Sequence, residues 1–134
     1  MAPLLPVPVT ATFDAAEPWR ASLGAAFQDL VPGAVDNAPA PRGSLSGARI
    51  GPVGVFTVSG TPQVVQRTTS AVRRSPGDLI KVCVQLHGRA TVQQGGREVC
   101  LGPGELAVYD TGRPYKIWLE GAWTSAVMRF PATR

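Results

Sequence analysis

The sequence predicts a mainly β protein that folds as a single barrel or sandwich. Turn-forming residues are frequent, with 15 Gly and 13 Pro among 134 residues, and this favours many short strands over long helices. Turn signals recur at near-regular intervals from residue 44 onward, which is typical of all-β architectures. The length suits one domain with one hydrophobic core.

Residues 1–43 precede this β region and are expected to pack on it as an arm, a helix and a loop. The first dozen residues are interrupted by prolines and predict an extended arm. A helix is predicted over residues 18–30, where apolar side chains recur every three or four positions, at Trp19, Leu23, Phe27 and Leu30. We expect this stripe to pack against the barrel of the same chain; the alternative is a stripe left for a partner domain.

Residues 44–134 form the predicted barrel. Its strands are expected at residues 44–50, 54–59, 63–69, 79–87, 90–93, 97–101, 105–109, 115–119 and 123–130. Closely spaced turns between these segments indicate antiparallel strands rather than a parallel α/β sheet.

The strand at 79–87 has two chemically different faces, because side chains alternate across a strand. One face carries Ile80, Val82, Val84 and Leu86, and the other carries Lys81, Cys83, Gln85 and His87. Hydrophobicity alone places the first face inside. The opposite arrangement would line the interior with polar groups, as in a ligand pocket, if the N-terminal helix or a second subunit covered the apolar face.

Charge and composition argue against several classes of protein. The net charge is +4, but the basic residues are dispersed and only Arg73 and Arg74 are adjacent, so the clustered stripe that nucleic-acid binding needs is missing. No apolar run approaches the roughly 20 residues that span a bilayer. The proline-rich start does not resemble a signal peptide, and we expect a cytoplasmic protein.

Candidate catalytic residues are few. Two cysteines cannot form a disulfide framework, and Cys83 and Cys100 lie in apolar segments where cysteine is expected to be a small core residue. His87 is the only histidine and is expected at a strand end on the surface rather than as a base. Asp110 is expected to bond its own turn, and Glu105 to begin an edge strand.

Five short motifs occur in a characteristic order in the predicted barrel. They are VQRTT at 65–69, VQLHG at 84–88, VQQGGR at 92–97, LGPGEL at 101–106 and YDTGRPY at 109–115. Together they resemble the N-terminal AraC-binding-like domain of AraC/XylS-type bacterial transcription regulators, over residues 44–131. This resemblance implies a cupin-like (jelly-roll) β-barrel with one or two peripheral N-terminal helices.

In that family, two helix-turn-helix units that follow the barrel bind the DNA. Nothing after Phe130 could supply such a unit, so we expect either a fragment that ends at the domain boundary or a stand-alone sensor. The resemblance implies an effector-sensing and dimerisation domain, with DNA bound only through the missing C-terminal domain. The alternatives are a small metal-independent cupin enzyme and a structural oligomerisation module whose lumen is filled by side chains.

The cupin resemblance also bears on metal binding. Cupins hold a metal with three histidines and a glutamate, and this chain has one histidine. When Gly88 and Gly104 are aligned with the cupin glycines, the glutamate falls on Lys81 and the last histidine on Tyr115. A shifted register puts Cys83 and Gln85 at ligand positions. We therefore expect no metal and no other cofactor, and a lumen that binds a small molecule of unknown identity.

The candidate ligand-binding residues are Arg67, Lys81, Cys83, Gln85 and Tyr115. Arg67 lies inside a predicted strand without an acidic neighbour, so it could hold a ligand carboxylate through two hydrogen bonds. The alternative is that Arg67 pairs with Asp110 or Glu105 to stabilise the fold. Lys81, Cys83 and Gln85 would line the same lumen if they face inward, and Tyr115 would cap it.

Overall fold

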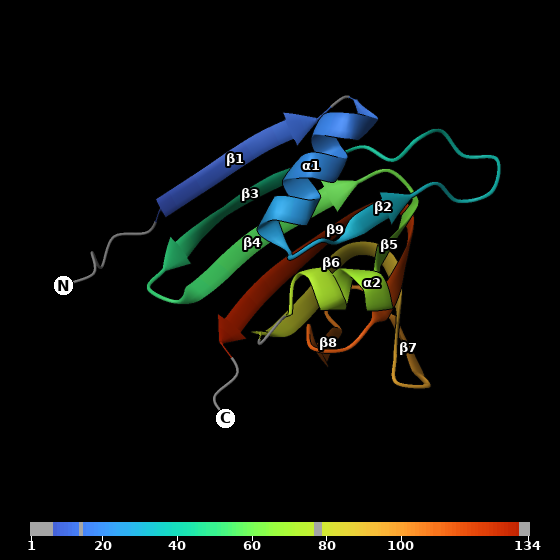
Figure 1. Cartoon of the computed structure of the whole chain (residues 1–134). Helices are drawn as coiled ribbons and strands as arrows, with labels where there is room; N and C mark the ends of the chain where they lie inside the picture. The colour runs from blue at the N-terminus through green and yellow to red at the C-terminus, as the bar shows by residue number, and fades with distance from the viewer. Residues whose placement is uncertain (1–6, 14, 77–78, 132–134) are drawn as a thin grey trace.

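The protein is mainly β, with two short helices, in a computed structural model that describes residues 7–13, 15–76 and 79–131. The elements in chain order (Figure 1) are β1 (Val7–Phe13), α1 (Ala16–Ala26), β2 (Val31–Gly33), β3 (Gly43–Ile50), β4 (Val53–Gly60), β5 (Gln63–Arg67), α2 (Thr69–Arg74), β6 (Leu79–Gln94), β7 (Arg97–Leu101), β8 (Leu106–Asp110) and β9 (Tyr115–Pro131). This confirms the predicted fold class.

All the strands belong to one antiparallel sheet that curls into a half-barrel. The two long strands, β6 and β9, pair with each other along most of their length. Residues 123–129 of β9 also pair with β4, while residues 115–119 pair with β5. Residues 80–84 of β6 pair with β8, while residues 90–94 pair with β7. The curled sheet therefore has two parts that share β6 and β9. Their strand orders are β1-β3-β4-β9-β6-β8 and β2-β5-β9-β6-β7.

The bend between these two parts passes through Gly88 in β6. Register shifts in the β6–β9 ladder flank this residue, between Gln85 and His87 and between His87 and Arg89. Gly88 has a φ of 71°, and a Cβ there would lie 3.0 Å from Trp123. The sequence predicted two strands here, residues 79–87 and 90–93, with a turn between them. The structure has one bent strand, because a glycine in a bulge bends a strand without ending it.

The N-terminal region and the helices differ in part from their predicted form. Residues 7–13 of the predicted extended arm form β1, which pairs with β3 along its whole length, and residues 1–6 lie outside the described residues. Helix α1 ends at Ala26, since Gln28 and Asp29 both have a φ of 57° and cannot continue a helix. The second helix, α2, is not N-terminal but lies between β5 and β6, where the Thr68 side chain accepts a hydrogen bond from the Ala71 N–H at 3.0 Å.

Helix α1 packs into the interior of its own half-barrel. Figure 1 shows it lying across β3 and β4, next to β2. Its predicted apolar stripe is buried at every position, namely Trp19, Leu23, Phe27 and Leu30. The Phe27 ring meets the Phe56 ring of β4 edge-on, with centroids 5.2 Å apart. The expectation that the stripe packs on the same chain is confirmed.

The two faces of β6 are arranged as the cupin alignment implies. Lys81, Cys83 and Gln85 are buried inside, while Leu86 on the opposite face is 40% exposed. Helix α1 lies on the interior side, so it does not cover the outward apolar face. The cysteine prediction is half right, because Cys83 is buried and Cys100 is exposed. Within the described residues, neither helix is long and apolar enough to cross a membrane.

Candidate functional site

Two hollows open around the inner face of β6 and β8. The first, here called the inner cavity, lies between the sheet and α1 and has a volume of about 40 Å³. The second, here called the β7–β8 cleft, lies between two strands that do not pair with each other and has a volume of about 660 Å³. Tyr109 lines both hollows.

Lys81 projects from β6 into the inner cavity, with only 1% of its surface exposed. Its ammonium donates a hydrogen bond to the Tyr115 hydroxyl at 2.6 Å and lies 4.7 Å from the centre of the Phe27 ring. Burial, and to a smaller extent the nearby positive charges of Arg67 and Arg129, lower the pKa of Lys81 to about 7. No carboxylate of the described residues acts on this amine. The cavity therefore holds a cationic group without an anionic partner among those residues.

One tyrosine hydroxyl and two aromatic rings lie next to the amine, and a second tyrosine packs against the first. The Tyr109 and Tyr115 rings lie 4.7 Å apart at a tilt of 55°. Burial raises the pKa of both tyrosines, so both stay neutral at physiological pH. Tyr115 therefore solvates Lys81 without neutralising its charge, and Tyr109 is held beside this pair by ring packing.

Cys83 and Gln85 follow Lys81 along the same face of β6. Cys83 lines the inner cavity, and burial raises the pKa of its thiol, which disfavours the thiolate. The Gln85 carboxamide accepts a hydrogen bond from the Ser125 hydroxyl at 2.7 Å and donates one to the His87 carbonyl at 2.7 Å. Gln85 thus connects the bend of β6 to β9, while Ser125 lines the cavity.

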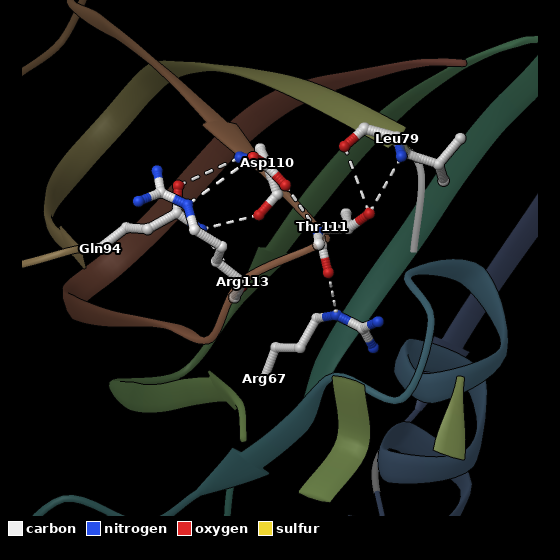
Figure 2. A network of polar contacts seen from close by, with 7 residues as sticks. Arg67, Leu79, Gln94, Asp110, Thr111 and Arg113 are labelled. Carbon is white, nitrogen blue, oxygen red and sulfur yellow. Dashed lines mark hydrogen bonds and ion pairs between the residues drawn. The ribbon is translucent and has the colours of Figure 1, made fainter. Parts of the chain in front are cut away.

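Arg67 is fully buried, and its guanidinium joins three loops. Its Nε donates to the Thr111 carbonyl at 2.8 Å (Figure 2). Its two terminal nitrogens donate to the carbonyls of Gln28 and Ser75. Thr111 in turn bonds Leu79 through its backbone N–H at 3.0 Å. Arg67 therefore connects the loops that follow α1, α2 and β8.

The acceptors of Arg67 are carbonyl oxygens and not the carboxylates of Asp110 or Glu105, which the structural alternative had named. Asp110 instead accepts from the Gly112 N–H at 2.6 Å, as a turn residue does, and its other oxygen lies 3.7 Å from Arg113 (Figure 2). Glu105 accepts from the Gly102 N–H at 2.7 Å. Each carboxylate therefore accepts a hydrogen bond from a backbone N–H of its own turn.

The five predicted site residues therefore converge only in part. Lys81, Cys83 and Tyr115 lie together, Gln85 is one hydrogen bond away through Ser125, and the Arg67 guanidinium is directed to the loops. Sequence reasoning did not select Phe27, Tyr109 or Ser125, which complete the surroundings of Lys81. The alternation of β8 could have indicated that Tyr109 faces inward, but no local signal indicated the other two.

The remaining titratable groups do not assemble into a metal site. Across residues 7–13, 15–76 and 79–131, no three His, Cys, Asp or Glu side chains lie close enough together to hold a metal ion. His87 is exposed on the bend of β6. Lys81, Tyr109 and Ser125 line the inner cavity and Tyr115 bonds Lys81, so the interior offers hydrogen-bonding groups and one amine.

The chain is similar in sequence to one family and to one curated protein. Residues 13–134 match the family model described as AraC-binding-like domain. An uncharacterized protein in the nit 5' region of Bacillus sp. (strain OxB-1) is 32% identical over 77 residues, which are 58% of this chain and 30% of that protein.

Solved structures resemble the fold. The AraC-like transcriptional activator CuxR superimposes with a TM-score of 0.79 at 20% identity, over 93% of this chain and 47% of CuxR. The Cupin_2 domain of an XRE family transcriptional regulator from Enterobacter cloacae gives a TM-score of 0.51 at 11% identity, over 94% of this chain and 98% of that domain. KdgF from Halomonas sp. gives 0.53 at 14% identity, over 75% and 86%. The chain thus has a cupin-like fold and spans less than half of the curated relative and of CuxR.

Proposed function

The chain belongs to the AraC-binding-like domain family, and from this membership we propose that it is the effector-sensing and dimerisation domain of an AraC/XylS-type bacterial transcription regulator. In this proposal the regulator is cytoplasmic, and it binds DNA through a separate C-terminal domain. Residues 44–134 would form the sensor barrel, with residues 1–43 packed on it. The domain would work by binding and not by catalysis.

The observation that carries this proposal is the buried amine of Lys81, which has no carboxylate partner among the described residues. Burying a charge is costly unless a group of opposite sign accompanies it. A ligand with an anionic end would supply that group, and Tyr115, Tyr109 and Phe27 would contact its apolar body. The effector class we propose is therefore a small carboxylic acid.

Binding would have to enlarge the inner cavity. A volume of about 40 Å³ accommodates little more than one water molecule, whereas ligand pockets measure roughly 300–1,000 Å³. An effector would thus favour an opened arrangement over the closed one. A ligand with different affinity for two arrangements is what a sensor requires. The near-filled lumen also favours the alternative of a structural oligomerisation module, for which no acid should bind.

Calorimetric titration with sodium benzoate, and with benzyl alcohol as an uncharged probe of similar shape, tests the effector class. We expect saturable benzoate binding, at least about tenfold weaker binding of the alcohol, and loss of benzoate binding in Lys81→Met. Lys116→Met, which removes a lysine from β9 outside the inner cavity, should bind like the wild type. Acetate and decanoate serve as a shorter and a longer carboxylic acid. Equal binding of benzoate and benzyl alcohol would contradict the proposal, as would failure of all three acids to bind.

Dimerisation is supported by the outward face of β8, β6 and β9. The sheet register places Val82 beside Val108 and Met128, and Val84 beside Leu106 and Ala126. Leu106 is 55% exposed and Val108 61% exposed. Monomeric proteins seldom expose a contiguous apolar patch of this kind. We propose that a second copy covers it, because an uncharged patch can pair with itself across a two-fold axis without burying a charge.

A further inference from the structure

The geometry points to the β7–β8 cleft as the outer part of the effector site, with Tyr109 as the side chain that separates it from Lys81. In the joined site, a carboxylic acid would place its carboxylate at Lys81 and its apolar body along Tyr109, Val92 and Val99. This inference rests on the proposed function. It adds the route to the inner cavity and the position of the apolar body, and access through the cleft can be measured without reference to the charge of Lys81.

The floor of the cleft belongs to the interior of the half-barrel. Val92, Ala107 and Tyr109 line the cleft, yet all three are buried. Val99 is paired with Val92 on the neighbouring strand but is 45% exposed. An inward-facing valine is exposed in this way only where the opposite layer is missing. The interior is therefore open toward the cleft down to the level of Tyr109.

Tyr109 is the one lining residue of the inner cavity that also lines the cleft, among the residues that the structure describes. The cavity is also lined by Leu23 of α1 and by Phe27, which directly follows the helix; both are 2% exposed and packed in the core. Displacement of Tyr109 would join about 40 Å³ to about 660 Å³ without moving the helix. The joined space then falls within the usual range of small-molecule sites.

The strand that carries Tyr109 is paired along one edge only in the described structure. β8 pairs only with β6, and β7 also pairs only with β6, so the two strands face each other across the cleft without ladder hydrogen bonds in the described structure. Tyr109 contacts Tyr115, whose hydroxyl holds Lys81. A ligand that displaces Tyr109 would consequently change the surroundings of Lys81.

The mouth of the cleft suits an anion that also has an apolar body. Its lining includes Arg97 and Arg113, with Glu98 as the opposing charge, so the mouth carries one more positive than negative side chain. The Gln94 carboxamide donates to the Asp110 carbonyl at 2.7 Å and to the Arg113 carbonyl at 3.2 Å, and this joins β6 to the loop after β8 (Figure 2). Below this rim the walls are Val92, Val99 and Tyr109.

The two cysteines allow a test that needs no ligand. Cys83 lines the inner cavity, so in a Cys100→Ser background its alkylation by iodoacetamide reports access to that cavity. We expect Tyr109→Ala to raise the alkylation rate at least about tenfold in native buffer, and Val99→Trp, which fills the cleft, to lower it. Tyr109→Phe keeps the ring and should alkylate within about twofold of the parent.

Two controls distinguish access to Cys83 through the cleft from a general destabilisation of the core. Leu119→Ala truncates another wall of the inner cavity that does not line the cleft, and it should accelerate alkylation far less than Tyr109→Ala. Val55→Trp places the same bulky side chain on the outward face of β4 and should leave the rate unchanged. Equal acceleration by Leu119→Ala and Tyr109→Ala would overturn the inference, as would a Val99→Trp rate equal to that of the parent.

Benzoate titration then distinguishes the two proposals. If Val99→Trp weakens benzoate binding together with Lys81→Met, the cleft is part of the site. If Lys81→Met abolishes binding while Val99→Trp and Tyr109→Ala leave it unchanged, the proposed effector site stands and its extension into the cleft is wrong.

Discussion

At the scale of single residues, the two buried basic side chains Arg67 and Lys81 differ in the number of hydrogen-bond acceptors around them. Arg67 donates to three backbone carbonyls, which suits a guanidinium that remains charged under all ordinary conditions. Lys81 has one hydroxyl acceptor and two aromatic rings within reach, so its charge is poorly compensated. Both were candidate ligand-binding residues in the sequence, and Arg67 was the one expected to hold a carboxylate. The structure leaves Lys81 as the group that has most to gain from an anion.

The pKa of Lys81 predicts a pH dependence of stability. Because the folded pKa of about 7 lies below the ordinary value of 10.5, the unfolded chain holds more protons between these values. The free energy of unfolding should therefore rise as pH increases above 7, and the cost of the buried charge should be fully present below pH 7.

The measurement is urea unfolding between pH 6 and 8.5, below the ordinary pKa of 9.0 of Cys83, whose raised pKa acts in the opposite direction. Lys81→Met should be more stable than the wild type at pH 6, by on the order of a few kcal/mol, and should lose this pH dependence. A wild-type stability that falls between pH 7 and 8.5 would contradict the assignment.

Removal of the Arg67 guanidinium should lower the free energy of unfolding. Arg67→Ala would leave buried carbonyls of three loops without their donor, and we expect a loss of about 3 kcal/mol or more in the free energy of unfolding. Arg113→Ala, at a residue with a 61% exposed side chain, is the matched control and should change stability by less than about 0.5 kcal/mol. If Arg67→Ala is as stable as the wild type but does not bind benzoate, Arg67 is a ligand-binding residue and not a structural one.

At the scale of elements, the half-barrel depends on how β6 and β9 bend. Each long strand belongs to both parts of the sheet, so the bend brings Lys81 of β6 and Tyr115 of β9 from separate ladders into hydrogen-bond contact. Helix α1 then closes the interior with its buried stripe, and the Arg129 side chain of β9 donates to the Ala26 carbonyl at the end of that helix. The position of each site residue thus follows from strand bending more than from local preference.

The bend predicts unequal costs for two glycine substitutions. Gly88 and Gly96 both have a positive φ, of 71° and 76°. A Cβ at Gly88 would lie 3.0 Å from Trp123, whereas a Cβ at Gly96 meets nothing within 4 Å. Gly96→Ala should cost about 1–2 kcal/mol for the backbone conformation alone, and Gly88→Ala should cost more, because it also displaces Trp123. Urea unfolding of both variants measures the difference; equal costs would show that Gly88 is replaceable at the bend.

At the scale of the whole molecule, the curled sheet leaves two surfaces uncovered. One is the β7–β8 cleft, where the interior is open, and the other is the outward apolar face of β8, β6 and β9. Both involve β8, which is an edge strand in the described structure. A copy packed on the outward face would restrain β8, and a ligand in the cleft would displace it. The two proposed roles, sensing and dimerisation, would then act on one strand.

Self-association of the chain should depend on the outward face. We expect light scattering to give the mass of a dimer at high concentration, and Leu106→Glu to give a monomer, because a charge would be buried at the two-fold contact. Ile50→Glu is the control, since Ile50 is similarly exposed, 52% against 55%, but lies at the end of β3 outside the patch. A monomeric wild type, or a dimeric Leu106→Glu, would contradict this interface.

Several features of the protein follow from its sequence because they are local. Glycine and proline spacing indicates many short strands, the three- and four-residue repeat of the α1 stripe indicates its buried side, and strand alternation groups Lys81, Cys83 and Gln85 on one face. Which face turns inward is not local. Hydrophobicity favoured the face of Ile80 and Val82, and the structure places the polar face inside because α1 and the bent β9 enclose it there.

Contacts between distant segments were decided only by the tertiary structure. Local sequence cannot show that Phe27, just after the first helix, and Tyr115 of the last strand both meet Lys81, since 54 and 34 positions separate them from it. Nor can it show that the partners of Arg67 are carbonyls, because backbone acceptors exist at every residue and only the loop geometry selects three of them. The sequence by itself determined the kind of fold and the inventory of polar groups; the bend of two long strands decided which of those groups face one another.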